Sequence, residues 1–192
     1  MPLGIPDDEY GPPPADLAAL LRLNAAQDDG LDEALSELGC RLLAPDDAPT
    51  LLNPGSYMSQ DELDDPSIAA GIVATEQVCA LISFFVEDEE SNLFGYWHGP
   101  EGAALADAAI VKYDNEGQFA LLQGRGLVEA LIGDRVFDDD EAFAEHAERF
   151  DELGIAVANR SWESLASPNP ATKPDELHTV LYQHAEADRT ST

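Results

Sequence analysis

The sequence predicts a single α+β domain, in which a small, mainly antiparallel sheet of β-hairpins carries helices packed chiefly on one face. Two pairs of short apolar runs, 81–86 with 93–97 and 110–113 with 118–122, are separated by acidic or turn residues, as in hairpins. Apolar residues recur at helical spacing on both sides of these hairpins. With 192 residues, 44% of them hydrophobic, the chain is long enough to bury one core.

The N-terminal region predicts an arm, two helices and a strand. Five prolines and an acidic cluster in residues 1–14 favour a loosely attached, extended arm. A helix is expected over 15–27, with an apolar face made by Leu17, Leu20, Leu21 and Leu23. The Asp-Asp-Gly run at 28–30 should end it. A second helix over 31–38 stops before Gly39, and residues 40–43 predict a short strand.

Residues 44–66 hold three prolines before Pro66, a glycine and several acids, and they predict a long surface loop with one helical turn at 59–63. Pro66 suits the first position of a helix of about twelve residues. The expected buried stripe of that helix consists of Ile68, Ile72, Val73, Val78 and Cys79.

The first hairpin pairs residues 81–86 with 93–97 across an acidic loop, 87–92. Its strands are rich in aromatic residues, which a pleated, half-buried surface accepts. We expect one of the two neighbours Tyr96 and Trp97 to lie inside and the other to be available at the surface. The acids of the loop are expected to be solvated at the tip of the hairpin.

The second hairpin has the sharper turn signal, Asp114-Asn115-Glu116-Gly117. An Asp at the first turn position bonds the backbone two residues further on, and Gly at the end adopts positive φ without penalty. The sequence therefore predicts a tight turn that ends at Gly117.

The C-terminal region predicts further helices. A short helix over 127–132 precedes a longer one over 138–153, whose acidic start complements the helix dipole and which Gly154 ends. Residues 155–157 suit an edge strand and 161–165 a short helical turn. A last helix over 174–186 places Leu177, Val180, Leu181 and His184 on one side. We therefore expect one domain over 15–186 and a frayed tail over 187–192.

The order of these pieces resembles the SUKH superfamily, bacterial relatives of a fungal cell-wall-assembly regulator. The resemblance covers a little over a quarter of the chain. The matching residues are Phe85, Asp88, Gly95, Tyr96, Trp97, Asp114, Glu116, Gly117, Leu127, Glu129 and Leu131. Members are mostly immunity proteins that bind and neutralise a cognate toxin domain, and no catalytic residues are known for the fold. The resemblance thus implies a non-enzymatic binding protein.

Charge bears on the partner. The 39 Asp and Glu residues against 9 Lys and Arg residues give a net charge of −30. Such a chain repels phosphates and anionic membranes, so nucleic acid and membrane are not expected partners. It attracts a basic protein, as nuclease toxins typically are, and speeds the encounter. Plain solubility or adaptation to a salty cytoplasm accounts for the same charge, so both interpretations stay open.

Motifs for catalysis or metal binding are not found in the sequence. The four histidines show no His-Glu-x-x-His pattern, there is no Gly-x-Ser-x-Gly elbow, and the glycines at 124 and 126 lack the Lys-Ser/Thr of a phosphate loop. We expect no catalytic residues, no metal and no cofactor. The two cysteines, Cys40 and Cys79, suit buried free thiols better than a disulfide. Without a signal peptide or a long apolar run, a soluble, cytoplasmic protein is expected.

Two functions from different classes follow. The first is an immunity-type protein that occludes a basic toxin domain with an acidic, aromatic-studded face, and the second is a regulatory or scaffolding interaction protein without a toxin partner. An uncharacterised hydrolase ranks behind both, and the oligomeric state is left open. The candidate partner-binding residues are Glu87, Asp88, Glu89, Glu90, Tyr96 and Trp97, with Asp61, Glu62, Asp64 and Asp65 of the long loop.

Overall fold

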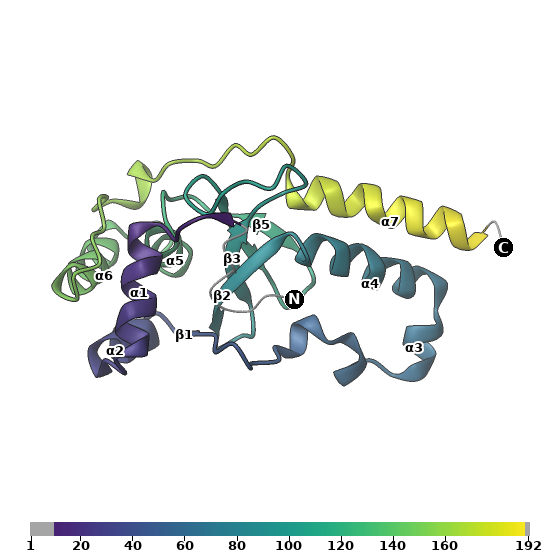
Figure 1. Ribbon diagram of the computed structural model, residues 1–192, viewed down its shortest axis with the longest axis horizontal. Coiled ribbons are helices and arrows are strands. Elements are labelled where there is room, and N and C mark those ends of the chain that lie inside the picture. The colour runs from purple at the N-terminus through teal and green to yellow at the C-terminus, as the bar shows by residue number, and fades with distance from the viewer. Residues whose placement is uncertain (1–9, 191–192) are drawn as a thin grey trace.

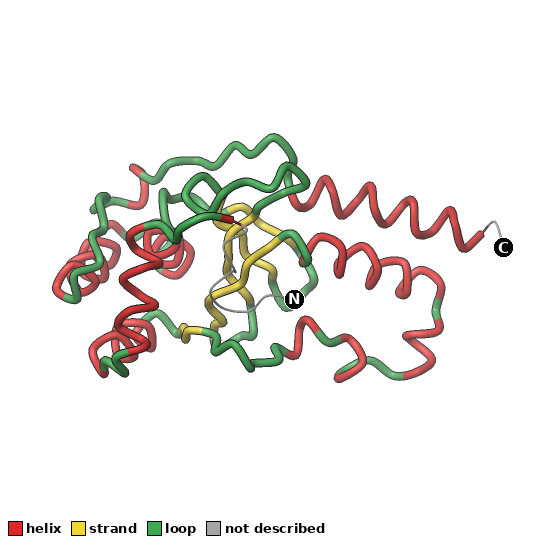
Figure 2. Tube along the Cα trace, viewed as in Figure 1, coloured by secondary structure: helices red, strands yellow, loops and turns green. Residues whose placement is uncertain are grey.

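The computed structural model describes residues 10–190, so most of the predicted arm lies outside the described residues. The predicted single α+β domain is confirmed, with a sheet in the middle and helices on either side of it (Figures 1 and 2). On one side lie α1 (Ala15–Ala25), α2 (Asp29–Glu37), α5 (Leu127–Arg135) and α6 (Asp140–Glu152). On the other side lie α4 (Pro66–Cys79) and α7 (Pro174–Thr190), preceded by the short α3 (Gln60–Asp64).

The sheet is an antiparallel meander in the order β1-β2-β3-β4-β5. Its strands are β1 (Cys40–Leu42), β2 (Ile82–Asp88), β3 (Leu93–Trp97), β4 (Ala109–Tyr113) and β5 (Phe119–Leu121). Both predicted hairpins are present. The first has a β-bulge, because Phe84 pairs with Gly95 while Val86 pairs with Phe94, leaving Phe85 as the extra residue.

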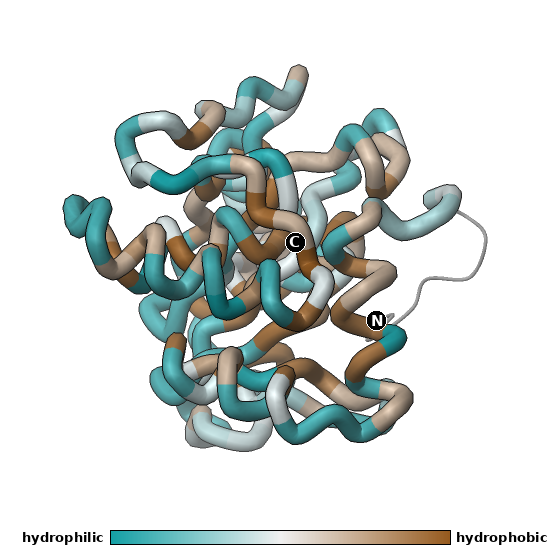
Figure 3. Tube along the Cα trace, turned by 90° about the vertical axis from the view of Figure 1, so that its left-hand side faces the viewer, coloured by the Kyte–Doolittle hydropathy of each residue, from teal (hydrophilic) through white to brown (hydrophobic). Residues whose placement is uncertain are grey.

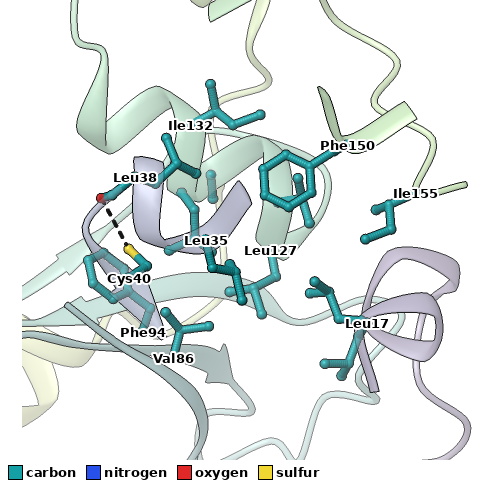
Figure 4. Close-up of a cluster of buried hydrophobic side chains, with 14 of the residues drawn as sticks. Leu17, Leu35, Leu38, Cys40, Val86, Phe94, Leu127, Ile132, Phe150 and Ile155 are labelled. Carbon is teal, nitrogen blue, oxygen red and sulfur yellow. Dashed lines mark hydrogen bonds between the residues drawn. The ribbon is translucent and has the colours of Figure 1, made fainter. Parts of the chain in front are cut away.

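One hydrophobic cluster lies on each face of the sheet. The larger joins the sheet residues Phe85, Val86, Phe94, Tyr96 and Ile110 to α1, α2, α5 and α6, and Figure 4 shows part of it. The smaller cluster lies on the opposite face, where the sheet packs against α4 and α7. Its sheet residues are Ile82, Phe84, Leu93, Trp97, Val111, Tyr113 and Phe119. Hydrophobic and hydrophilic positions alternate along the chain in Figure 3, as amphipathic helices require. The sheet is therefore buried on both faces.

Helices α4 and α7 lie side by side and extend away from the sheet (Figure 1). The buried residues of α4 are Ala70, Ala74, Val78 and Cys79, whereas the predicted Ile68, Ile72 and Val73 are only half-buried. Thr75 of α4 lies 3.1 Å from the ring of His178 in α7. Of the predicted α7 face, Leu177 and Leu181 pack on the sheet, but Val180 and His184 are exposed. Small residues on α4 thus let α7 approach closely.

Three boundaries differ from the sequence prediction for local reasons. The chain breaks between the two helices as predicted, but α1 already ends at Ala25 and α2 begins at Asp29, within the Asp-Asp-Gly run, because Asp28 caps α2 by accepting hydrogen bonds from the N–H groups of Gly30 and Leu31. Residues 155–157 lie in irregular backbone rather than in a strand, and Val157 N–H donates to Asp151 Oδ1 at 2.9 Å. Helix α7 continues through Thr190, so residues 187–190 are helical instead of frayed.

The described end of the predicted arm is attached to the domain. The Tyr10 ring stacks on His98 with centroids 3.6 Å apart, and the Tyr10 carbonyl accepts a hydrogen bond from Leu105 N–H. The predicted long loop contains the 3-10 turns Thr50–Leu52 and Pro54–Ser56 before α3. Both segments are thus held more closely than their composition predicts.

Gly117 adopts a φ of 82°, which confirms the predicted turn. Asp114 Oδ1 accepts hydrogen bonds from the N–H groups of Glu116 and Gln118. We expect Gly117→Val to lower the free energy of unfolding by about 1–2 kcal/mol, because a β-branched residue is strained at positive φ. Urea denaturation measures this cost. An unchanged midpoint would contradict it, since among the described residues a Cβ here meets nothing within 4 Å and strain alone sets the effect.

Candidate partner-binding surface

Tyr96 and Trp97 are both buried, each with 1% exposure, so the expectation that one of them reaches the surface is wrong. The physical reason is that helices cover both faces of β3. Tyr96 enters the cluster beside α5, where burial and the nearby Asp16 raise the pKa of its hydroxyl. Trp97 enters the opposite cluster, and its indole N–H donates to the Thr172 carbonyl at 2.8 Å. Neither residue is available to a partner.

Asp88 is also buried, with 0% side-chain exposure, which corrects its predicted place at a solvated tip. Strand β2 runs through Asp88, and only the residues after it form the turn. Its Oδ1 accepts hydrogen bonds from the N–H groups of Glu90 and Asn92, both at 2.9 Å. Its Oδ2 accepts from the Asn92 side chain at 2.8 Å and from Arg135 Nη1 at 3.0 Å. Asp88 therefore organises the turn instead of contacting a partner.

The turn of the first hairpin is fastened to its neighbours as well. Asn92 Oδ1 accepts a hydrogen bond from Asn115 N–H at 2.9 Å, and the Asn115 side chain donates to the Glu90 carbonyl at 3.2 Å. On the other side, Glu89 N–H donates to the Gly39 carbonyl at 2.9 Å. The turns of the two hairpins are thus joined to each other and to the segment before β1. Such bonds fix the backbone of the turns that carry the exposed carboxylates.

Three acidic residues on the joined turns of the two hairpins are exposed. We call these residues, Glu89, Glu90 and Glu116, the acidic tip. Glu89 has 73% side-chain exposure and makes a long contact of 3.6 Å with Arg135. Glu87, which the sequence prediction grouped with them, has 13% side-chain exposure and pairs with Arg41 across β1 and β2. The exposed acids of the first hairpin are therefore its turn residues, not the whole predicted run.

The four predicted acids of the long loop lie on and beside α3, and all are exposed. Glu62 completes a capping box with Ser59, and the hydrogen bonds from Ser59 lower the pKa of the Glu62 carboxyl. Asp65 caps α4 by accepting from the N–H groups of Ser67 and Ile68. Asp61 and Asp64 carry no such capping role. Two of the four acids thus have a structural function as helix caps.

A groove of about 260 Å³ adjoins the acidic tip at Glu116. Loop 51–58 and α4 supply its apolar lining, and the second turn supplies Asn115, Glu116 and Gly117. Tyr57 on this groove is 50% exposed. Sequence reasoning missed Tyr57, although an aromatic residue within a Pro- and Gly-rich loop is a usable signal for a contact residue.

A cavity of about 550 Å³ lies at the opposite end of β3, and alanines and prolines make up half of its lining. Two of its lining residues are bonded to Thr172, since the Thr172 hydroxyl donates to Glu101 and the Thr172 carbonyl accepts from the Trp97 indole N–H. His98 also lines it and lies 2.9 Å from the Ser83 hydroxyl. Ser83 has 0% exposure, and the second His98 nitrogen faces the Ala103 carbonyl at 2.7 Å rather than a carboxylate. His98 therefore joins β2, through Ser83, to the segment after β3, through Ala103.

The side chains that could bind a metal ion or act as a nucleophile are dispersed or buried in residues 10–190. In residues 10–190, no group of three His, Cys, Asp or Glu side chains is placed to hold a metal ion. Cys40 and Cys79 are buried free thiols, and burial raises the pKa of each to about 12. A thiol with so high a pKa stays protonated and unreactive at neutral pH. Within the same described residues, no helix combines the length and hydrophobicity needed to cross a membrane.

Comparisons with family models, with curated proteins and with solved structures find no match to this chain.

Proposed function

We propose that this chain is a non-enzymatic binding protein that neutralises a basic toxin domain, as the resemblance to immunity proteins implies. The observation that carries the proposal is the acidic tip, three exposed carboxylates on turns that buried hydrogen bonds hold in place. A preorganised charged surface binds with little loss of conformational entropy. The adjoining groove with Tyr57 offers an aromatic contact at the edge of the same surface.

Long-range electrostatics support a basic partner. With a net charge of −30, the chain attracts a cationic protein over distances set by the Debye length, roughly 30 Å at 0.01 M salt and 10 Å at 0.1 M. Association should therefore slow as salt is added, whereas dissociation, governed by short contacts, should change less.

The joint variant Glu90→Lys with Glu116→Lys is expected to slow association with the toxin domain by about tenfold at low salt. Both residues are exposed, so the fold should persist. Reversing all of 87–90 is unsuitable, because it would place a lysine at the buried Asp88. Stopped-flow mixing at several salt concentrations provides the rates. The matched control is Glu145→Lys with Glu148→Lys on α6, which makes the same change in net charge at another exposed place.

If the control variant and the tip variant slow association equally, the net charge acts without a defined surface and the acidic tip has no special role. An on-rate that ignores salt would assign the charge to solubility.

Co-expression tests the biological role directly. If a neighbouring gene encodes a toxin with a basic C-terminal domain, cells that produce that domain should survive when they also produce this chain. The tip variant should protect less well than the α6 control at matched protein levels. Death of the cells despite a measurable complex would contradict immunity and favour the regulatory or scaffolding alternative.

A further inference from the structure

The exposed Phe137 and the partly buried Trp162 form an aromatic pair on the side of the molecule that carries α5 and α6. Phe137 is 70% exposed, more than any other large hydrophobic residue among those described. The two rings meet edge to face, with centroids 4.7 Å apart and an interplanar angle of 72°. Burial of such a ring against another molecule would be favourable, and aromatic residues often supply the main contacts of a binding surface.

Hydrogen bonds fix the backbone that carries both rings. Phe137 lies between α5 and α6, in a link closed by the bond from Asp139 N–H to the Val136 carbonyl at 3.0 Å. Asp139 then caps α6 by accepting from Ala142 N–H at 3.0 Å. Trp162 is the first residue of the 3-10 turn Trp162–Ser164, and its backbone N–H donates to Asp140 Oδ1 at 2.7 Å. The pair is thus part of the folded framework.

A groove of about 210 Å³ adjoins the pair, between β5 and α5. Leu121, Leu122, Ala130 and Leu165 give it apolar walls. Gly133 lets these walls come close, since a Cβ on it would lie 2.6 Å from Leu165 Cδ1. The groove is large enough for one long side chain, not for a cofactor-sized ligand.

The surroundings of the pair are acidic. The exposed run from Asp138 to Glu141 follows Phe137 directly, and exposed Glu163 follows Trp162. Within the described residues, Lys112 makes its cation–π contact with the Phe94 ring rather than with this pair, and it forms an ion pair with Asp134. The nearest arginine in sequence to Trp162, Arg160, is bonded to Asp151. The aromatic pair is therefore not occupied by a cation of this chain.

We propose that Phe137 and Trp162 are the anchor site for an arginine side chain of a basic protein partner. A guanidinium stacks on aromatic rings while it bonds carboxylates, and the groove accommodates its aliphatic stem. The proposal rests on the proposed function and names a second contact for the same partner. Arg135, which pairs with Asp88 and Glu89 beside the acidic tip, lies two residues before Phe137 in the sequence. A second copy of this chain is disfavoured, since it would bring two acidic surfaces together.

The probe is the peptide acetyl-(Gly-Arg)4-amide, titrated into the ¹⁵N-labelled full chain at 0.15 M salt. The chain has two tryptophans, and Trp97 provides an internal reference because its indole N–H is buried and bonded to Thr172. We expect a saturable shift of the Trp162 indole N–H signal and none at Trp97. The matching citrulline peptide, which lacks the charge, should cause no shift.

Phe137→Ser should weaken binding of the arginine peptide by about tenfold. Because Phe137 is 70% exposed, the melting temperature should stay the same. The control is Val180→Ser, which removes an exposed hydrophobic residue on α7 and should change the affinity less than twofold. A Trp162 signal that does not move, or a Phe137→Ser affinity equal to that of the wild type, overturns the anchor site.

The outcomes separate this site from the proposed function. Shifts confined to the amides of Glu89, Glu90 and Glu116 would overturn the anchor site while leaving the acidic tip as a binding surface. Trp162 shifts that depend on protein concentration without peptide would assign the pair to self-association and overturn the arginine proposal. Failure of toxin protection with an intact Trp162 response would instead count against the immunity role alone.

Discussion

Asp88→Ala is expected to lower the free energy of unfolding by about 3–5 kcal/mol. The substitution removes a fully buried carboxylate that accepts hydrogen bonds from Glu90, Asn92 and Arg135. It leaves two turn N–H groups without their acceptor and separates the Arg135 guanidinium, which has 20% side-chain exposure, from its closest carboxylate. Loss of one partner from a buried charged pair costs far more than loss of an exposed one.

Urea denaturation followed by circular dichroism measures this difference. The control is Glu90→Ala, a neighbouring exposed acid whose replacement should change the unfolding free energy by no more than about 0.5 kcal/mol. Equal and small costs for the two variants would show that the Asp88 network does not hold the turn. Glu89 and Glu90 would then lose the fixed positions on which the acidic tip depends.

The hairpins were predictable because their signals are local. The turn at 114–117 has an Asp that bonds the next residues and a Gly at positive φ, and both features depend only on nearby backbone. The cover on both faces was not predicted, because α7 comes from the far end of the sequence. A usable signal existed in β2, where residues 82–86 show no polar alternation apart from Ser83, as in strands buried on both sides.

The site was less predictable than the fold, because it depends on contacts between residues that are far apart in the sequence. Asp88 reads as one acid in a run of four, and its burial depends on Arg135, which lies beyond the predicted end of the helix at Ile132. Exposure of Phe137 follows from the link between α5 and α6, which no local pattern specifies. Charge patterns in a sequence show how many acids there are, but the folded structure decides which of them face a partner.

Gly95→Ala is expected to lower the free energy of unfolding by about 3 kcal/mol or more, above the usual cost of one added methyl group. Gly95 lies in the middle of β3, opposite Phe84 at the β-bulge. A Cβ there would lie 2.2 Å from the Ser83 carbonyl oxygen and 2.8 Å from Phe84 Cα. These are backbone atoms of the neighbouring strand, so no rotamer change relieves the clash, and β2 must move away from β3.

The matched control for Gly95→Ala is Gly71→Ala on α4. Among the described residues, a Cβ at Gly71 meets nothing within 4 Å, so the change should stabilise the helix by up to about 1 kcal/mol. Thermal and urea unfolding of both variants give the comparison. Opposite signs are expected because one glycine permits the close approach of two strands, whereas the other only adds disorder to the unfolded chain. A Gly95→Ala variant as stable as the wild type would mean that β2 and β3 pair without the bulge at Phe85, and the buried position of Asp88 at the end of β2 would then lose its structural basis.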